Sequence, residues 1–550
     1  MVANMTDEPR TESDRSEAPR WMGALAGVAA AAVALGFSQW VEGASDVPGL
    51  VLGVGEWVTD HTPGWIAEWS IEDLGSAGKG NLLPGITIVS FLIAAALGDL
   101  SLRKTRKWGL LGFLAFGLFG AFAAARNPQS PAFASWFWSL LAAGLGIATL
   151  VVLVSIALRT LPDPDAADEL PSPLNPPRSR RTFLAWSGGA GAVALTGVGL
   201  GRATGPSAAE LAREQVVLPT TSTTAAPATT TPATTTAETA ASTPGTLSTE
   251  PLTEPVGLSS WITPNEEFYR IDTAFSIPQV DPADWALSFT GMVDNPFELT
   301  YDEILGMDLV DRTITLSCVS NPVGGDLVGN AVWTGVPLNE LLDRAGVQPG
   351  ATQFTSRSVD NWTCGFPTEL LGDGRNALLA VGMNGEPLPI RSGFPARLVV
   401  AGIYGYVSAT KWIEEIRMTT WEDFNGYWIN LGWSKEGPMK TTSRIDVPRT
   451  RSTIAAGPTP VAGVAWAPTR GISKVEVSAD GGESWWEADI ARPGTSEAWV
   501  QWNTMWDAPT GTHGLSVRAY DDSGEQQPFG PKDVAPDGAE GWHTVLISVT

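Results

Sequence analysis

Two cysteines, Cys318 and Cys364, are the residues of this chain best suited to metal or nucleophilic chemistry. Cys318 ends the run from Thr313, in which apolar and polar residues alternate as in a strand with one buried face. Turn residues at 321–325 follow it. A thiol beside such a loop could bind a metal or attack a substrate, although a buried structural thiol is the commoner role of a lone cysteine. Cys364 is expected to be such a buried thiol.

Composition excludes several kinds of chemistry. The net charge of -25 argues against binding to nucleic acid, which requires a basic surface. Two cysteines are too few for a disulfide framework or an iron–sulfur cluster. The three histidines are His61, His513 and His543, and none lies in an apolar segment, so no paired ligands for an intramembrane haem are present. We therefore expect no haem, flavin or iron–sulfur cluster.

The elements that must carry these residues fall into two halves of different composition. Four apolar segments in the first 160 residues are long enough, or nearly so, to cross a bilayer, for which about 20 residues are needed. A fifth, Gly- and Ala-rich segment is only marginally apolar. In order, the segments are Trp21–Trp40, Leu82–Leu100, Trp108–Ala125, Phe133–Leu158 and Phe183–Leu200. The sequence therefore predicts a membrane domain of about five helices over residues 21–202, after a cytoplasmic tail of residues 1–20.

Basic residues between these segments predict their orientation. One group lies between the second and third segments, and another just before the fifth: Arg103, Lys104, Arg106 and Lys107, then Arg178, Arg180 and Arg181. Both groups are expected on the cytoplasmic side. With five crossings, the chain after Arg202 is expected outside, which makes this a multi-pass protein of the cell membrane.

The sequence SRRTFL, from Ser179 to Leu184, resembles a twin-arginine export signal placed inside the chain. Such signals move cargo that folds before it crosses the membrane, which suits a domain that acquires a cofactor in the cytoplasm. The alternative is that these arginines only fix the orientation of the helix.

Beyond the membrane half, a linker rich in Thr, Ala and Pro is expected over residues 203–254. A mixed α+β domain should follow over 255–440, with strands at Trp285–Thr290 and Arg397–Val400 and helices at Pro337–Ala345 and Pro367–Leu371. Residues 441–550 alternate as strands joined by turns, which predicts an immunoglobulin-like β-sandwich.

Four stretches in this outer half together resemble the sulfite oxidase family of molybdopterin enzymes, in the family's domain order. They are TPNEEFYRIDT at 263–273, TLSCVSN around Cys318, MNGEPLPIRSGFPARLVVAGIYGYVSATKWI at 383–413, and the strand-rich GVAWAPTRGISKVEVSADGGESW. The resemblance covers roughly residues 255–550. It implies a molybdopterin-binding catalytic domain and a C-terminal dimerisation domain.

The resemblance also implies roles for single residues. Cys318 would bind molybdenum as a thiolate, while a pterin dithiolene and oxo groups supply the other ligands. Arg397 and Lys411 match basic positions that contact the cofactor, whose phosphate needs cationic donors. Further candidate cofactor contacts are Asn265, Phe268, Tyr269, Arg270 and Ser408. Asp360, Asn361 and Trp433 are candidates for the substrate pocket, with Trp362 as a second wall.

The chain departs from the family where sulfite oxidases hold sulfite. Ile271, Asp272 and Thr273 stand at the positions of an Arg-Asn-His sequence, and Pro322 and Val323 at those of two arginines. Two further changes replace a histidine by Ser392 and a tyrosine by Trp433. Each removes a positive charge or a proton-handling group, whereas a small dianion needs closely placed cations. An uncharged or organic substrate is expected instead.

The sequence thus predicts a membrane-anchored molybdenum oxidoreductase that transfers an oxo group to or from a small molecule other than sulfite. One alternative is a reductase of sulfoxides or N-oxides, similar to the periplasmic enzymes that repair methionine sulfoxide. Another is a non-catalytic binding protein on the same scaffold. Because no haem, flavin or iron–sulfur motif is present, electrons are expected to pass to or from a separate partner, a cytochrome or a quinone-linked protein. The resemblance of the C-terminal domain to a dimerisation domain implies that a homodimer is possible.

Overall fold

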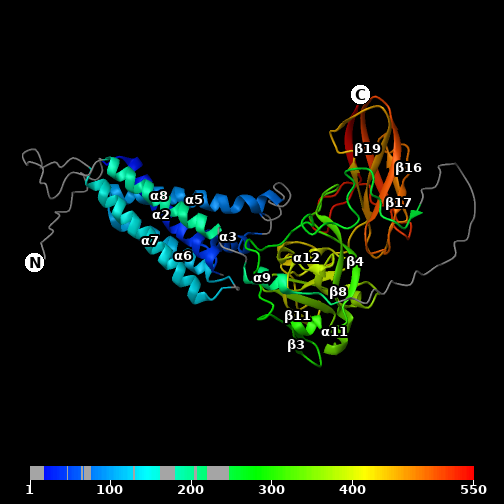
Figure 1. Cartoon of the computed structure of the whole chain (residues 1–550), viewed down its shortest axis with the longest axis horizontal. Helices are drawn as coiled ribbons and strands as arrows, with labels where there is room; N and C mark the ends of the chain where they lie inside the picture. The colour runs from blue at the N-terminus through cyan, green and yellow to red at the C-terminus, as the bar shows by residue number, and fades with distance from the viewer. Residues whose placement is uncertain are drawn as a thin grey trace, which may run out of the picture. The chain divides into compact units, whose positions relative to one another are not determined.

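The computed structural model describes residues 18–45, 47–63, 66, 76–127, 130–160, 180–202, 207–219 and 247–550. It divides into two compact units. The first is helical and consists mainly of residues up to Pro206, and the second contains almost all of the chain from Ser207 onward (Figure 1). Each unit is described by itself.

The helical unit contains five helices long and apolar enough to cross a membrane. These helices are α2 (Arg20–Ala44), α5 (Ser76–Arg103), α6 (Arg106–Ala124), α7 (Ala132–Leu158) and α8 (Arg180–Arg202). They match all five apolar segments that the sequence indicated, although α6 ends one residue before the predicted segment. A further helix of 11 residues, α3 (Leu50–Asp60), was not predicted, and it lies between the first and second apolar segments.

Small residues let the apolar helices pack closely. A methyl group added at Gly27 of α2 would collide with the backbone of Ala94 on α5, and one at Gly36 would collide with Ala194 on α8. Close approach of backbones at glycine is typical of helix packing in membranes, where contact area replaces the hydrophobic effect. The composition of these segments therefore explains their packing as well as their length.

The first part of the second unit is built on two five-stranded sheets around one core. One sheet has the order β3-β2-β11-β6-β7, and the other β10-β8-β5-β4 with β9 added to β8. The strands of the first are β2 (Ala286–Gly291), β3 (Phe297–Thr300), β6 (Gln353–Ser358), β7 (Thr363–Pro367) and β11 (Ile413–Thr419). Those of the second are β4 (Val310–Ser317), β5 (Val328–Pro337), β8 (Ala377–Met383), β9 (Glu386–Pro387) and β10 (Arg397–Val400).

Short helices connect these strands. They are α10 (Tyr301–Leu305), α11 (Leu338–Ala345) and α12 (Gly405–Ser408), with 3-10 turns η2 (Thr368–Leu371), η3 (Ile390–Ser392) and η4 (Ile429–Leu431). The strands and helices expected near residues 285, 337, 367 and 397 are present as β2, α11, η2 and β10. The mixed α+β architecture of the domain agrees with the sequence pattern.

Strand β4 differs from the expectation of one buried face. Its last four residues are all buried, polar ones included. Thr315 explains this, because its N–H donates to Glu497 O at 3.0 Å and its hydroxyl oxygen accepts from the Trp499 N–H at 2.7 Å. A segment of the C-terminal domain thus covers the edge of β4, and it satisfies polar groups that would otherwise face water.

The C-terminal part forms two further five-stranded sheets, whose apolar residues share one core. Their orders are β1-β17-β18-β14-β12 and β13-β20-β19-β15-β16. The first contains β1 (Leu247–Ser248), β12 (Thr442–Val447), β14 (Gly457–Trp466), β17 (Asp489–Ala491) and β18 (Val500–Ala508). The second contains β13 (Thr453–Ile454), β15 (Lys474–Ser478), β16 (Trp486–Glu487), β19 (Gly511–Tyr520) and β20 (His543–Val549). The immunoglobulin-like character of this C-terminal part stays a prediction.

The predicted linker, 203–254, contains ordered structure at both ends. Helix α9 (Ala208–Gln215) starts with a capping box between Ser207 and Glu210, and β1 pairs with β17 at the other end. Arg213 of α9 donates to Leu388 O and Pro387 O, both at 2.8 Å. The described residues 207–219 and 247–254 belong to the second unit, and residues 220–246 of the predicted linker lie outside the described residues.

Candidate functional site

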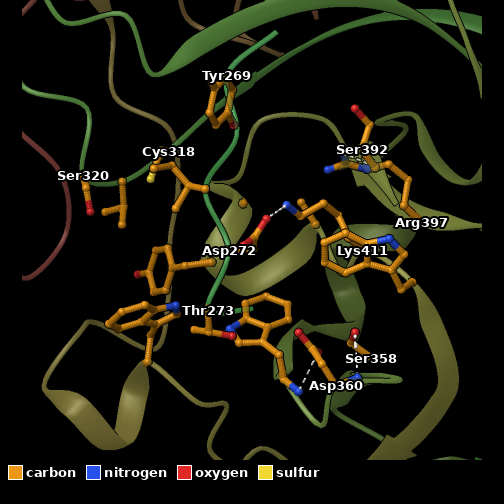
Figure 2. Close-up of a pocket in the computed structure, with 18 of the residues that line it drawn as sticks. Tyr269, Asp272, Thr273, Cys318, Ser320, Ser358, Asp360, Ser392, Arg397 and Lys411 are labelled. Carbon is orange, nitrogen blue, oxygen red and sulfur yellow. Dashed lines mark hydrogen bonds and ion pairs between the residues drawn. The ribbon is translucent and has the colours of Figure 1, made fainter. Parts of the chain in front are cut away.

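One cavity of about 100 Å³ in the second unit contains most of the residues singled out from the sequence (Figure 2). Loops supply its walls, at the ends of β4, β6 and β10 and before β2. They bring together residues 268–273, 318–320, 358–362, 391–397 and 405–412, with Trp428 and Trp433. Segments up to about 160 residues apart in the chain thus meet in one site.

Cys318 follows β4 and faces this cavity. Its N–H donates to Leu327 O at 2.9 Å, and its C=O accepts from the Asn321 N–H at 3.1 Å. The Asn321 side chain closes the loop by accepting from the Leu327 N–H at 2.9 Å. Burial raises the pKa of the Cys318 thiol, while hydrogen bonds from Ser320 and the charge of Lys411 lower it. The loop therefore holds a thiol that an ion in the cavity could deprotonate.

Arg397 places a nearly buried positive charge beside the cavity. Its guanidinium donates to Ser392 O at 2.9 Å and lies 4.9 Å from the ring centroid of Trp333. Burial lowers the pKa of Arg397 to about 10, while Tyr269 acts in the opposite direction. Within the part of the chain that the structure describes, no carboxylate forms an ion pair with Arg397 or with Arg391, another residue of the cavity wall. Such a charge favours an anionic group nearby.

Lys411, in contrast, is neutralised within the protein. Its ammonium lies 2.5 Å from Asp272, whose carboxylate also accepts from Arg270 at 2.7 and 3.0 Å. Burial lowers the pKa of Lys411 to about 8, and the nearby charge of Asp272 acts against this shift. Asp272 therefore keeps a buried cation in place at one wall of the cavity.

Aromatic side chains form another wall. The rings of Trp428 and Trp433 are 6.2 Å apart at 78°, and Tyr406 lies 5.9 Å from Trp433. The Tyr406 hydroxyl donates to Ser434 O at 2.6 Å, which fixes the ring. Trp362 and Trp412 complete the lining. This wall is suited to an organic group rather than to a small hydrated anion.

The structure brings seven of the predicted site residues into the cavity lining: Phe268, Tyr269, Cys318, Asp360, Arg397, Lys411 and Trp433. Four others do not line it. Asn265 bonds to Met383 and Asn384, Arg270 pairs with Asp272, and Asn361 takes a positive φ of 66° in a turn. Ser408 is fully buried, and its hydroxyl donates to Tyr404 O at 3.0 Å. The cofactor or substrate contacts expected of these four residues stay predictions.

Other lining residues were not proposed from the sequence as site residues, namely Ser320, Ser358, Arg391, Tyr406, Trp412 and Trp428. Arg391 could have been found from its place six residues before Arg397 in the same Gly- and Pro-rich block. Pro322 and Val323 line a separate hollow of about 10 Å³. The contrast with sulfite oxidases therefore rests on the departures that do line the cavity, namely Ile271, Asp272, Thr273, Ser392 and Trp433.

Cys364 is a buried thiol on β7, as expected. Its sulfur lies 3.3 Å from the Ser356 hydroxyl and 3.1 Å from that of Thr410. Burial raises the pKa of Cys364 to about 11 despite these hydrogen bonds. No group of three or more metal-binding side chains occurs among the residues that the structure describes.

Comparison with known proteins agrees with this geometry. Residues 274–428 match the model of the oxidoreductase molybdopterin binding domain, and residues 437–549 that of the Mo-co oxidoreductase dimerisation domain. The chain is 28% identical over 355 residues to a sulfite oxidase of Arabidopsis thaliana, with 53% of this chain and 89% of that protein covered. It is 27% identical over 346 residues to the mitochondrial sulfite oxidase of Homo sapiens, with 53% and 62% covered.

More distant similarities extend to other enzymes. An NADH nitrate reductase of Oryza sativa is 27% identical over 317 residues, 46% of this chain and 34% of that protein. The crystal structure of the sulfane dehydrogenase SoxCD from Paracoccus pantotrophus aligns with a TM-score of 0.47 and 24% identity, over 52% of this chain and 82% of that one. The matched region spans less than two thirds of the human protein and of the nitrate reductase.

Proposed function

Residues 274–549 of this chain form a molybdopterin oxidoreductase of the sulfite oxidase family, and from this premise we propose that the enzyme transfers an oxo group to or from a substrate other than sulfite. The observation that carries the proposal is one cavity in which the Cys318 thiol faces inward and Arg397 and Arg391 lack carboxylate partners among the described residues.

The residues present fit a molybdenum–pterin group. Cys318 would hold the metal, and Arg397 and Arg391 would receive the phosphate and other polar atoms of the pterin through charge-assisted hydrogen bonds. Phe268 and Tyr269, stacked at 5.3 Å, would pack against the pterin. When bound, the cofactor supplies the metal that exchanges an oxo group and two electrons with the substrate. The protein excludes water and orients the substrate.

The cavity supports a substrate other than sulfite. Lys411 is already neutralised by Asp272, and Thr273 and Trp433 line the cavity without positive charge. A small dianion would need several cations that are free to bind it. The aromatic wall of Tyr406, Trp428 and Trp433 supports an organic substrate instead.

Metal content tests the proposal most simply. We expect about one molybdenum per chain in the purified full-length protein, because Cys318 supplies one ligand position. Protein that carries no molybdenum after expression in a host that makes the cofactor would contradict the proposal, and it would favour a non-catalytic binding protein.

The direction of the reaction can be read on the same metal-loaded protein. A reduced viologen dye that is reoxidised only when a sulfoxide or N-oxide is added would establish a reductase. Reduction of an artificial acceptor by an organic substrate would establish an oxidase or dehydrogenase. Turnover of sulfite at rates typical of enzymes would contradict the exclusion of sulfite.

Five apolar helices support anchoring in a membrane. We place the second unit outside the cytoplasm, because the basic residues Arg103, Lys104 and Lys107 cluster where α5 ends and α6 begins, and this junction is expected on the cytoplasmic side. Export through the twin-arginine route would suit a domain that folds around its cofactor first, and Arg180 and Arg181 are exposed at the start of α8. Replacing both by lysine should leave the second unit accessible to protease only from the cytoplasmic side.

The proposed function implies two partners, a second copy of this chain and an electron-transfer protein. The match of residues 437–549 to a dimerisation domain supports a homodimer. Electrons would pass to or from a separate protein, a cytochrome or a quinone-linked one. Mass measurement of the detergent-solubilised protein tests the dimer, and a monomeric mass at micromolar concentration would contradict it.

A further inference from the structure

We propose that the substrate of this enzyme carries a positively charged organic group, such as an alkylated ammonium or a sulfonium, and that Asp360 binds this group together with Trp362, Trp428 and Trp433. The inference rests on the proposed function, because it names the substrate class of the same cavity. It goes further in assigning a charge to the substrate and a specific carboxylate to its recognition.

The tight turn that follows β6 holds Asp360 and Trp362 in the cavity lining. The Ser358 N–H donates to Trp362 O and the Asn361 N–H donates to Ser358 O, each at 2.9 Å. The Asp360 carboxylate accepts from the Trp362 N–H at 3.2 Å. Asn361 takes the positive φ that the turn requires. The carboxylate and the indole are thus held in a fixed turn rather than on a mobile loop.

The other two tryptophans are fastened to the same place. The loop that carries them is joined to β7 by the Tyr427 N–H, which donates to Thr363 O at 3.0 Å. Within the loop, the Trp433 N–H donates to Trp428 O at 3.2 Å. Because Thr363 directly follows Trp362, this loop and the turn lie side by side. Three indole rings and one carboxylate therefore line the same end of the cavity.

Charges are divided between the two ends of the cavity. Figure 2 shows Asp360 near Ser358 and well apart from Ser392, whose carbonyl oxygen binds Arg397, with Lys411 between them. Asp272 is paired with Lys411 and Arg270. Asp360, in contrast, forms no ion pair with any Lys or Arg that the structure describes. If an anionic cofactor binds beside Arg397, the protein charge that remains to face the substrate is the negative charge of Asp360.

A carboxylate beside aromatic rings selects cations over neutral molecules and anions. The faces of indole rings attract cations, and ammonium groups bound in aromatic cages use this attraction. The same carboxylate repels an anion such as sulfite, in agreement with the family contrast at Ile271, Asp272 and Thr273. Cationic and neutral molecules of one shape should therefore bind with clearly different affinities.

A matched pair of probes tests the inference on the purified full-length protein. Choline and 3,3-dimethyl-1-butanol have the same shape but differ in charge, and isothermal titration calorimetry measures the affinity of each. We expect choline to bind at least tenfold more tightly. Asp360→Asn should reduce this preference at least fivefold while binding of the neutral probe stays unchanged, and Trp362→Leu should weaken choline at least threefold.

The control is Asp373→Asn, because Asp373 pairs with Arg375 and does not line the cavity. It should keep the wild-type preference for choline. Equal binding of the two probes to the wild type, or an undiminished preference in Asp360→Asn, overturns the inference. Stoichiometric molybdenum without a preference for choline overturns this inference alone. If protein that lacks molybdenum still prefers choline, the proposed function is overturned, but the cation-binding site at Asp360 is supported.

Discussion

At the scale of single residues, the cavity is defined by how buried charges are balanced. Lys411 has a carboxylate partner, whereas among the described residues the buried Arg397 has no carboxylate and the half-buried Asp360 has no cation. Unbalanced charges are costly in a protein that binds nothing. Their separation within one cavity supports our proposals of an anionic cofactor at one end and a cationic substrate group at the other.

Asp272 should be the most important of these residues for stability. Asp272→Asn leaves Lys411 and Arg270 without their shared carboxylate, and breaking a buried pair costs about 3 kcal/mol or more. We expect a lower melting temperature of the second unit by calorimetry. Asp373→Asn is the control, since its pair with Arg375 is 41% exposed on the aspartate side and should contribute about 1 kcal/mol at most. Equal melting temperatures of the two variants would refute the role given to Asp272.

The family resemblance singled out Cys318, Arg397 and Lys411, and all three line one cavity of the structure. It could not show that Asp272 pairs with Lys411, since 139 residues separate them. It also suggested Asn265 and Ser408 as cofactor contacts. Neither lines the cavity, their side chains bond to Met383 O and Tyr404 O, and the cofactor contacts stay predictions. A sequence motif predicts that a residue lies near a site, but the direction of its side chain depends on contacts with residues that are distant in the sequence.

At the scale of elements, the loop after β4 determines where the Cys318 thiol lies. Gly324 takes a φ of +76° in this loop, and a methyl group there would collide with the ring of His543 on β20. His543 in turn accepts a hydrogen bond at Nδ1 from the Ile445 N–H of β12 at 3.0 Å. The cysteine loop is therefore packed against the C-terminal sheets.

Gly324→Ala should displace this loop and lower the molybdenum content of the purified protein. The backbone strain of an alanine at positive φ costs about 1 kcal/mol, and the collision with His543 adds to it. Gly374→Ala is the matched control, because Gly374 has a φ of +92° with no atom within 4 Å of an added methyl group. If both variants keep the same molybdenum content and melting temperature, the loop is not held in this way.

His543 should make stability depend on pH. Burial lowers the pKa of His543 to about 4. The unfolded chain takes up this proton below about pH 6.5, whereas the folded protein does so only near pH 4. The contribution of the neutral ring to the free energy of unfolding is therefore fully present above pH 6.5 and is lost as the pH falls towards 4. At pH 5 the loss amounts to about 2 kcal/mol.

His543→Asn removes this titration and keeps an acceptor for the Ile445 N–H. Melting temperatures at pH 7.5 and 5 should therefore differ less in this variant than in the wild type. His513→Asn, at an exposed site beside Pro509, should keep the wild-type difference. An unchanged pH dependence in His543→Asn would show that another group is responsible.

The sequence predicted most elements but not how their faces are covered. Alternation around Cys318 indicated one buried face, yet Thr315 and Ser317 are buried as well, because residues 497–499 cover the edge of β4. Periodicity describes a strand within its own sheet. It carries no information about a second domain that packs on the edge.

At the scale of the whole molecule, residues 207–219 belong to the catalytic unit rather than to a free linker. Arg213 bonds to the carbonyl oxygens of Pro387 and Leu388, and Leu218 packs so closely on β8 that a methyl group at Gly382 would collide with it. Composition marked the region as a linker, and the short amphipathic helix within it gave too weak a signal to be recognised.

Cutting the chain within residues 220–246 tests this arrangement. A protease site inserted there and then cleaved should leave most of the fragment 247–550 with the membrane fraction, because α9 and Leu218 stay bound to it. Adding Leu218→Glu, which places a charge against β8, should release that fragment after cleavage. Complete release from the otherwise unaltered protein would show that residues 207–219 do not hold the catalytic unit.

The central claim is that Cys318 binds molybdenum in the cavity lined by Arg397 and Lys411, and X-ray absorption at the molybdenum edge tests it most directly. In the purified wild-type protein we predict three sulfur neighbours of the metal, two from the pterin and one from Cys318. In Cys318→Ser, with the pterin still bound, we predict two. The same number of sulfur neighbours in both proteins would contradict the claim.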